Sequence, residues 1–334
     1  MARVTIRDVA RLVGVSEATV SNALAGKPIV AAETKERVRR AATELGYQIS
    51  PIARALRTGH SGTVGIVVSN LANPFYADLL LGISSVLTPL GYQTIICNTE
   101  SREDLQEWHM THLLRHMVDG ILLLSYSSRT EDTTRALKAG VPLVSFWRRT
   151  GGSETSFVGL DDAAGMRAAL EHLWSLGHRR VGLLRAHLGS SPSDAREAEF
   201  RRFLEEHGAP PAPGCVAEAE ISIEGGREGT ARMLTLPEPP TAVIATSDIM
   251  ALGATVAAAD RGLAVPGGLS VVGFEDTFVA ALPQIQLTTV SVPRRELGVR
   301  AAEMLLERIA APSQPVRELV LQPGFVIRGT TSSP

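Results

Sequence analysis

The chain has 334 residues, of which 44% are hydrophobic, 20% charged and 4% aromatic. This length suits two or three folded units, and the composition is that of a globular protein rather than a chain disordered throughout. No apolar run approaches the roughly 18 to 20 residues that span a bilayer, which argues against a membrane protein. The opening residues, MARVTIRDVA, place Arg7 and Asp8 where a secretory signal would be apolar, so we expect a cytoplasmic protein.

The net charge of −2 hides a segregation of charge along the chain. Residues 1–60 hold ten Lys and Arg against five acidic residues, a net +5. The remaining residues hold 23 basic against 30 acidic side chains, a net −7. A small basic module on an acidic body is typical of a protein that binds a polyanion with one end, because phosphate neutralisation drives nucleic-acid affinity.

The N-terminal residues predict three short helices. Thr5 precedes an amphipathic run with Asp8 three residues later, a capping-box spacing, and this helix should end at Gly14. Ser16 can cap a second helix over SEATVSNAL, and a third should run from about residue 32 to 45 and end at Gly46. Three short helices with a tight turn between the first two predict a helix-turn-helix.

A hinge and a larger body follow this headpiece. Residues 51–57, PIARALR, predict a short helix that opens with Pro, and the following TGHSG is typical of a linker. We therefore expect a helix-turn-helix headpiece over residues 1–49, a hinge helix and linker over 50–62, and an effector-binding and dimerisation domain over 63–334.

The body alternates apolar strands with helices. Strands are predicted at GTVGIVVS, YQTIICN, GILLLS and VPLVSF, and the pattern restarts at about residue 161 with RRVGLLR, VAEAEIS, TAVIAT and LSVVGF. Continuous apolar strands between helices predict parallel, doubly wound sheets, here in two similar α/β lobes. A cleft between such lobes is a natural ligand site.

These residues resemble the LacI/GalR-type bacterial transcriptional repressors. The headpiece strings TIRDVARLVGVSEATVSNAL and VRRAATELGYQISPIARALRTG match the family's signature, and GIVVSNLANPFY, LEHLWSLGHRRVGLL, ATSDIMALG and LSVVGFEDTFVAALPQIQLTTV match landmarks of its body. The body is similar to periplasmic sugar-binding proteins. The resemblance implies a homodimer whose binding to a pseudo-palindromic double-stranded DNA operator is controlled by a small polar effector, such as a sugar.

The resemblance assigns the DNA contacts to particular residues of the headpiece. Glu17, Ala18 and Asn22 take the base-reading positions, where they can meet cytosine N4, a thymine methyl and adenine; a solvated helix face is the alternative. Hydroxyl groups near phosphates would position the module without selecting a sequence, and helix capping accounts equally well for the first two: Thr5, Ser16, Thr19, Ser21 and Thr34.

The hinge helix has its own implied contacts. Ala53 and Leu56 match residues that enter the minor groove, with Leu56 as an apolar wedge between base steps. Arg54 and Arg57 match neighbours that reach phosphates. The alternative for Leu56 is packing within its own domain. Two such wedges require a dimer, and the C-terminal GFVIRGTTSSP has no leucine heptads that would predict a coiled-coil tetramer.

The implied effector site draws residues from both lobes. Arg196 is the strongest candidate, because a guanidinium can hold a carboxylate or a pair of hydroxyls in fork geometry, with a surface salt bridge as the alternative. Phe75 and Tyr76 can stack on a sugar or base face, or simply pack. The matching positions are Ser69, Asn73, Phe75, Tyr76, Arg148, Arg196, Ile221, Ser247, Asp248 and Glu275.

Four positions depart from the family pattern, so the resemblance does not identify the ligand. Ile221 replaces a usual aromatic residue, and Trp147 stands where an acid is frequent. Glu199 replaces a glycine after Arg196, and Glu275 replaces a common aspartate.

Other functions find less support in the sequence. His109, His112 and His116 share a helical face but no acidic or cysteine cluster accompanies them, so no metal is expected. Cys97 and Cys215 lack CxxC spacing, which favours two thiols over a disulfide. The absence of GxGxxG, GxxxxGK[ST] and GxSxG argues against an enzyme, and no cofactor is expected. A solute-binding protein of the periplasmic type is the alternative function, opposed by the headpiece.

Overall fold

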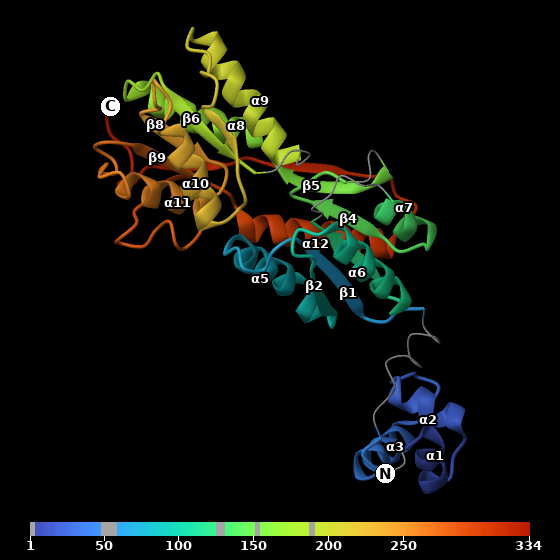
Figure 1. Cartoon of the computed structure of the whole chain (residues 1–334). Helices are drawn as coiled ribbons and strands as arrows, with labels where there is room; N and C mark the ends of the chain where they lie inside the picture. The colour runs from blue at the N-terminus through green and yellow to red at the C-terminus, as the bar shows by residue number, and fades with distance from the viewer. Residues whose placement is uncertain (1–3, 48–58, 125–130, 151–153, 187–190) are drawn as a thin grey trace. The chain divides into compact units, whose positions relative to one another are not determined.

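The computed structural model describes residues 4–47, 59–124, 131–150, 154–186 and 191–334. The chain divides into two compact units, Met1–Ser61 and Gly62–Pro334 (Figure 1). The described residues of the first unit are helical, whereas the second contains two α/β lobes. The hinge helix expected at residues 51–57 lies outside the described residues.

The first unit contains α1 (Ile6–Val13), α2 (Glu17–Leu24) and α3 (Ala32–Glu44). The expected capping box begins α1: the backbone N–H and the hydroxyl of Thr5 both donate to Oδ2 of Asp8, at 2.9 and 2.7 Å. Gly14 ends α1 in the left-handed conformation, with φ of 75°, which glycine adopts without a Cβ penalty. The helix-turn-helix prediction is confirmed.

A small apolar core holds these three helices together. Val9 of α1, Val20 of α2 and Val38 of α3 are fully buried in it. Arg37 of α3 donates from Nη2 to the carbonyl of Val13 at 2.8 Å, which satisfies a free carbonyl at the end of α1. The first two helices and the turn between them are therefore fixed by packing and by this side-chain cap.

The second unit is built on two six-stranded sheets, one in each lobe. The first lobe's sheet has the order β11-β5-β4-β3-β1-β2. These strands are β1 (Thr63–Val68), β2 (Gln93–Asn98), β3 (Gly120–Leu123), β4 (Leu143–Phe146), β5 (Ser156–Leu160) and β11 (Glu318–Leu321). All neighbouring strands in this sheet are parallel.

Helices cover both faces of the first sheet. They are α5 (Phe75–Leu87), which continues as the 3₁₀ helix Thr88–Leu90, α6 (Glu103–Arg115), α7 (Glu131–Lys138) and α12 (Arg294–Ala310). α5 and α12 pack closely at Gly82 and Gly298, where a Cβ would overlap the carbonyl oxygens of Arg295 and Leu79. Two glycines thus allow α12 to lie against α5.

The second lobe's sheet has the order β12-β10-β9-β8-β6-β7. Its strands are β6 (Val181–Arg185), β7 (Val216–Glu218), β8 (Ala242–Ala245), β9 (Ser270–Glu275), β10 (Thr288–Ser291) and β12 (Gly324–Val326). Its helices are α8 (Asp162–Ser175) and α9 (Ser191–Glu206), which pack together, and α10 (Ile223–Met233) and α11 (Asp248–Ala259), which form a second pair (Figure 1).

The eight expected strands are present, and the prediction of a two-lobed α/β body is confirmed. The strands are parallel as predicted except at one edge, where β12 is antiparallel to β10. The chain leaves the second sheet at the end of β10 and re-enters it after β11, so β12 starts where β10 finishes. The chain crosses between the lobes near residues 161, 292 and 322.

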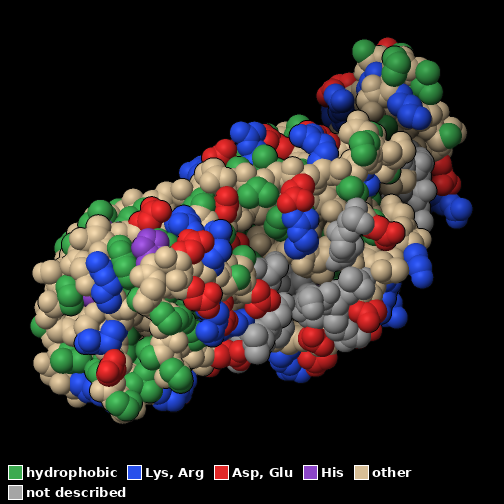
Figure 2. Space-filling view, turned by 90° about the horizontal axis from the view of Figure 1, so that it is seen from above, with side chains coloured by type: hydrophobic (Ala, Val, Ile, Leu, Met, Phe, Trp, Pro, Cys, Tyr) green, Lys and Arg blue, Asp and Glu red, His purple; other side chains and the backbone are tan. Residues whose placement is uncertain are grey.

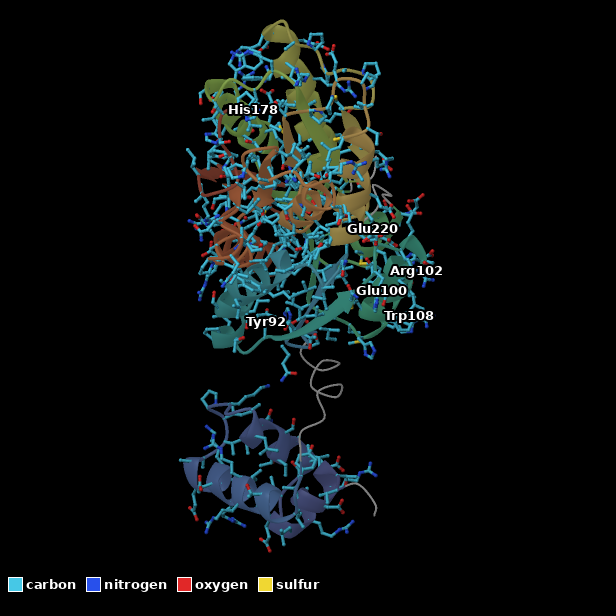
Figure 3. All side chains as sticks on the ribbon, turned by 60° about the vertical axis from the view of Figure 1, so that its left-hand side comes forward. Tyr92, Glu100, Arg102, Trp108, His178 and Glu220 are labelled. Carbon is cyan, nitrogen blue, oxygen red and sulfur yellow. The ribbon has the colours of Figure 1, made fainter. Side chains whose placement is uncertain are left out.

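The C-terminal segment is anchored to the second lobe by a buried histidine. His178 (labelled in Figure 3) is 1% exposed. Its Nδ1 lies 2.8 Å from Oγ1 of Thr241, and its Nε2 lies 2.8 Å from the carbonyl of Ser332. Burial lowers the pKa of His178, which favours the neutral ring that these contacts hold.

Charged side chains are intermingled on the face shown in Figure 2. Many form exposed ion pairs, for example Arg135 with Glu107 at 2.9 Å and Arg227 with Asp260 at 2.6 Å. Exposed pairs of this kind contribute about 0 to 1 kcal/mol each. These pairs leave positive and negative charges intermingled on the surface and contribute little to the stability of the fold.

Candidate functional sites

The outer face of α2 presents short side chains that could contact DNA. Ser16 caps the helix, its Oγ accepting the N–H of Thr19 at 3.1 Å. Glu17 and Ala18 in the first turn are exposed, and Asn22 one turn later is half-buried. Val20 and Ala23 point into the core. The sequence periodicity thus separates a packing face from a face that is free to meet a partner.

Glu17 is engaged within the headpiece. Its Oε1 lies 2.8 Å from Nε of Arg7 in α1, an ion pair whose side chains are 49% and 76% exposed. An exposed pair is weak, so Glu17 can exchange Arg7 for another donor at little cost. Among the hydroxyl residues, Thr5 caps α1 and Ser16 caps α2, while Ser21 and Thr34 are half-buried. The capping alternative therefore describes Thr5 and Ser16 in this structure.

The candidates of the hinge lie outside the described residues: Ala53, Arg54, Leu56 and Arg57. Their contacts with DNA stay predictions.

Most of the effector candidates gather where the two lobes meet, and we call this group the inter-lobe cluster. Several members lie at or just beyond the carboxyl end of a parallel strand, the edge where open α/β sheets bind ligands, whereas Phe75 and Tyr76 begin α5 and Arg196 lies within α9. Ser69 follows β1, Trp147 follows β4, and Glu275 ends β9. The cluster comprises Ser69, Asn73, Phe75, Tyr76, Trp147, Arg148, Asp162, Arg196, Asp248, Phe274 and Glu275.

Aromatic side chains form one wall of the inter-lobe cluster. The ring centroid of Phe75 lies 5.4 Å from that of Tyr76 and 4.6 Å from that of Trp147. The Tyr76 hydroxyl hydrogen-bonds to Ser69, and burial raises the pKa of this phenol. Trp147 has a left-handed φ of 64°, which is strained for a bulky residue. Ser69, Phe75, Tyr76 and Trp147 are all buried. The rings pack against one another in this structure, and the same rings are the ones that would stack on a ligand.

Arg196 is a buried cation rather than part of a surface salt bridge. Its side chain is 4% exposed, and its Nε and Nη2 lie 2.8 and 2.7 Å from Oδ1 of Asp162. Nη1 donates to the carbonyl of Thr246 at 2.8 Å. The guanidinium also stacks over the Phe274 ring at 3.5 Å. Nε and Nη1 are thus hydrogen-bonded within the protein, whereas Nη2 has no hydrogen-bond partner among the described residues.

Glu275 carries a carboxyl group that the protein satisfies incompletely. It is 6% exposed, and its Oε2 has no hydrogen-bond partner among the described residues. Burial, together with the nearby Asp248 carboxylate, raises the pKa of Glu275 to about 8. Arg196, Arg294 and the Asn73 side chain oppose this rise. The carboxyl is therefore largely protonated at neutral pH and can donate or accept one further hydrogen bond.

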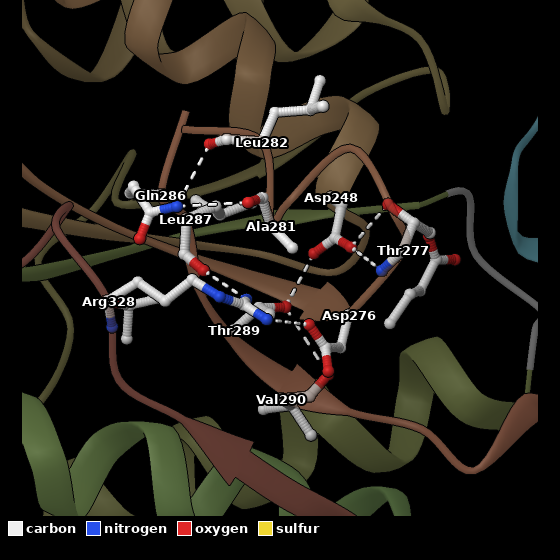
Figure 4. Close-up of polar contacts among 12 residues, drawn as sticks. Asp248, Asp276, Thr277, Ala281, Leu282, Gln286, Leu287, Thr289, Val290 and Arg328 are labelled. Carbon is white, nitrogen blue, oxygen red and sulfur yellow. Dashed lines mark hydrogen bonds and ion pairs between the residues drawn. The ribbon is translucent and has the colours of Figure 1, made fainter. Parts of the chain in front are cut away.

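Asp248 is held from within the second lobe (Figure 4). Oδ2 accepts the backbone N–H and the hydroxyl of Thr277 at 2.6 and 2.9 Å, and Oδ1 accepts the hydroxyl of Thr289 at 2.6 Å. Burial raises the pKa of Asp248 to about 6 despite these bonds. Ser247 caps α11, its Oγ accepting the N–H of Met250 at 3.3 Å. In this structure both residues fix the ends of strands and loops around the cluster.

The two remaining candidates have a different standing. Arg148 follows Trp147, and its charge lowers the pKa of Tyr76, so it faces the cluster. Ile221 is half-buried against the second core of lobe two, which includes Met250 and Ala254.

Four residues of this region were not among the predicted site residues: Trp147, Asp162, Phe274 and Arg294. Asp162 begins α8, and an acid at a helix start has an ordinary explanation in the helix dipole. Its pKa is raised by burial, with Arg196 opposing the rise. One usable signal was present, the position of the pair Asp161–Asp162 directly after an apolar strand. Trp147 was noted only as a departure from the family pattern.

His109 and His112 lie on α6 and make local contacts, and His116 directly follows the helix. Nε2 of His109 lies 3.1 Å from the carbonyl of Asn98, and the His112 ring lies 3.9 Å from the ring of Trp108, whose side chain is 53% exposed. Within the described ranges, no group of three His, Cys, Asp or Glu residues could hold a metal ion. Over the same ranges, none of the helices is both long enough and apolar enough to cross a bilayer. Cys97 and Cys215 are free and buried.

Two protein-family models match parts of the chain. Residues 5–50 match the family described as bacterial regulatory proteins, lacI family, and residues 170–331 match the periplasmic binding protein-like domain. The ribose operon repressor of Haemophilus influenzae is 32% identical over 325 residues, which cover 97% of each chain.

Solved structures share the fold over most of the chain. The lac repressor dimer bound to operator and the anti-inducer ONPF superposes with a TM-score of 0.87 at 29% identity, covering 99% of this chain and 100% of that one. A LacI family transcriptional regulator from Enterococcus faecium with bound ribose gives 0.74 at 27% identity, covering 81% and 99%. The headpiece, the two-lobed body and these full-length matches show that the chain belongs to the lacI family of bacterial regulatory proteins.

Proposed function

We propose that this protein is a homodimeric transcriptional repressor whose affinity for a pseudo-palindromic operator is set by a small polar effector bound between the lobes. In this proposal residues 1–49 bind DNA, residues 50–62 form a hinge that engages the minor groove, and residues 63–334 bind effector and dimerise. The observation that carries it is the joining, in one chain, of an exposed helix-turn-helix face to a buried inter-lobe cluster with an unsatisfied carboxyl. A DNA-binding regulator without a catalytic role would act in the cytoplasm, where the chromosome is.

The headpiece supports the DNA half of the proposal. Its net charge is +5 on an otherwise acidic chain, and the first turn of α2 leaves Glu17 and Ala18 exposed. A helix of this length fits the major groove. For Glu17 to accept a hydrogen bond from cytosine N4, it must release Arg7, which then becomes available to a phosphate. On binding, the protein would give up one weak ion pair and gain a base contact through Glu17 and a phosphate contact through Arg7.

The inter-lobe cluster supports the effector half. Three aromatic side chains offer an apolar face, while Glu275 offers a hydrogen-bonding group that is uncharged at neutral pH. The buried cation Arg196 is already neutralised by Asp162. These features suit a hydroxyl-rich, uncharged ligand such as a sugar, and a relative is named for ribose.

Exposed apolar residues support a second copy as the remaining partner. An apolar groove of about 450 Å³ lies between α5 and β2, lined by Ile66, Ala77, Leu80, Leu81, Ser84, Thr94 and Ile96. Leu81 is 57% exposed and Ile96 45% exposed. An exposed apolar patch on an edge strand is a typical protein interface. A dimer would place two headpieces on the two halves of a palindrome.

A gel-shift assay with the DNA upstream of the protein's own gene tests both halves together. The full chain is titrated with and without D-ribose, and with D-glucose as a comparison sugar. The titration is then extended to other pentoses and hexoses. We expect a discrete shift whose midpoint changes with at least one of these sugars. Removing residues 1–60 should abolish the shift, and a truncated body that still shifts the fragment would refute the domain assignment.

A further inference from the structure

One buried arginine at a crossover contacts both lobes. Arg294 is the first residue of α12, directly after the chain returns from β10 to the first lobe. It is 9% exposed. Nη2 lies 2.7 Å from Oδ2 of Asp78 on α5, and Nε lies 3.3 Å from the same oxygen. On its other edge, Nη1 donates to the backbone carbonyl of Glu275 in the second lobe. The guanidinium therefore bridges the lobes through the backbone of an effector candidate.

The backbone at Glu275 is strained and needs such support. Glu275 and Asp276 have φ values of 124° and 54°, a pair of consecutive left-handed residues that are not glycine. A residue other than glycine with such a φ is strained, and it persists only where its surroundings impose it. Strain of this kind in a binding region favours a functional explanation over an accident of packing.

Three side chains hold the strained segment, one for each residue. Arg294 holds the carbonyl of Glu275, Nη2 of Arg328 lies 2.7 Å from Oδ1 of Asp276, and Asp248 accepts both the N–H and the hydroxyl of Thr277. Figure 4 shows the last two contacts. Arg328 and Asp248 belong to the second lobe, so they move with the segment. Arg294 alone among these three is also tied to the first lobe.

We propose that Arg294 is a positioning residue for the effector site. By holding the Glu275 carbonyl against Asp78, Arg294 makes the location of the Glu275 carboxyl depend on how the lobes are arranged. The proposal rests on the effector role proposed for Glu275. It supplies the physical link that an effector-driven change needs, because a ligand shifts a conformational equilibrium only through contacts that differ between the states. A ligand that binds the Glu275 carboxyl would pull directly on the bridge between the lobes.

Arg294 can affect the Glu275 carboxyl through its charge or by positioning it, and loss of Arg294 shifts the pKa of Glu275 in opposite directions in the two cases. The titratable or charged groups that face it are Tyr76 of α5, Asp248 of α11, Arg196 of α9 and Arg294 of α12, together with the side-chain amide of Asn73 before α5. As a neighbouring cation, Arg294 lowers the pKa of Glu275, so loss of its charge alone would raise that pKa. If Arg294 instead holds Glu275 in its buried place, its loss lets the carboxyl reach water, and the pKa falls toward the value of about 4.3 found in unstructured peptides.

The experiment is a carboxyl ¹³C NMR titration of the full chain without effector, from about pH 4 to 10, with ¹³C at the side-chain carboxyl of glutamate. Glu275→Gln assigns the signal. We expect a midpoint near 8 in the parent and a clearly lower midpoint in Arg294→Gln. Arg294→Lys keeps the charge but cannot span both partners, so it should also lower the midpoint. Asp78→Asn, an exposed change on α5, should lower it less and remains informative if Arg294→Gln does not fold.

Arg300→Gln is the matched control, since Arg300 lies on the same helix and pairs only with Glu296 and Glu303 among the contacts described. It should leave the Glu275 midpoint unchanged. A raised or unchanged midpoint in Arg294→Gln, or a parental midpoint in Arg294→Lys and Asp78→Asn, would overturn the proposal. Because no effector is present, a failure of sugars to bind would refute the effector role and leave this result standing on its own.

Discussion

Replacing Arg196 with alanine should strongly destabilise the body of this protein. The buried guanidinium holds Asp162 through two nitrogens within 2.8 Å and also satisfies the carbonyl of Thr246. Its removal leaves a carboxylate that is only 9% exposed without its cation. Breaking a buried pair by removing one partner costs about 3–5 kcal/mol, whereas an exposed arginine is worth less than about 1 kcal/mol.

The pH dependence of this loss identifies its cause. Burial already raises the pKa of Asp162 in the folded protein, and Arg196 opposes that rise. Without Arg196 the folded pKa moves further above the unfolded value, so the carboxyl favours folding below the unfolded pKa of about 3.9 and opposes it as the pH rises. The deficit of Arg196→Ala should therefore be largest near pH 7 and shrink toward pH 4.

Urea unfolding of the full chain at pH 7 and pH 4.5 measures this loss, with Arg201→Ala as control. Arg201 lies on the same helix, is 47% exposed and pairs with Glu197 at 2.8 Å. The double variant Arg196→Ala with Asp162→Asn should recover a good part of the stability at pH 7, because it removes the unpaired charge. A deficit that is equal at both pH values, or that the double variant does not reduce, would refute the buried-charge explanation.

Three further predictions concern the cluster and the DNA contacts. Glu275→Gln should flatten the pH dependence of stability between about 5 and 8: a carboxyl with a folded pKa near 8 stabilises the fold below its unfolded pKa and loses this contribution as the pH rises, by up to about 1.4 kcal/mol per pH unit. Urea unfolding at pH 5 and 8 measures it, and equal slopes in parent and variant would contradict it. With about six to ten phosphate contacts in a dimer, DNA affinity should fall by orders of magnitude between about 50 and 200 mM salt in fluorescence anisotropy; a flat profile would exclude phosphate-driven binding. Leu56→Ala should keep nonspecific binding but lose operator preference and bending, because a methyl group is too short to hold a base step open; a circular-permutation assay that shows parental bending would assign Leu56 to packing.

Local sequence signals were sufficient for much of the fold. Thr5 with Asp8, Gly14 and Ser16 fix the ends of helices through bonds to residues no more than five positions away, so their patterns predicted α1 and α2 correctly. Six of the eight predicted strands of the body are buried parallel strands with continuous apolar runs, whereas β2 is mostly exposed and β7 partly exposed. Of the strands that were missed, β10 (TTVS) has a single apolar residue and β11 and β12 are partly exposed, whereas β5 (SFVGL) is buried like most of the predicted strands.

The site was less predictable because its organisation depends on long-range contacts. The sequence marked Arg196 as a candidate. It did not show that Arg196 pairs with Asp162, which is 34 positions away. Arg294 and Asp78 are 216 positions apart, and neither belongs to a pattern that marks it. Asp248 was nominated as an effector contact, and only the fold reveals that its carboxylate holds Thr277 and Thr289. Such pairings follow from topology, which brings strand ends of different lobes together.

If α2 selects a particular DNA sequence, the full chain should enrich a motif from a random double-stranded DNA pool, as read by sequencing and by anisotropy with the enriched fragment. We expect a pseudo-palindromic motif. A variant carrying Glu17→Ala and Asn22→Ala should lose this motif while it keeps salt-dependent binding to random DNA. Enrichment of no motif by the parent, or of the same motif by the variant, would contradict selection by α2.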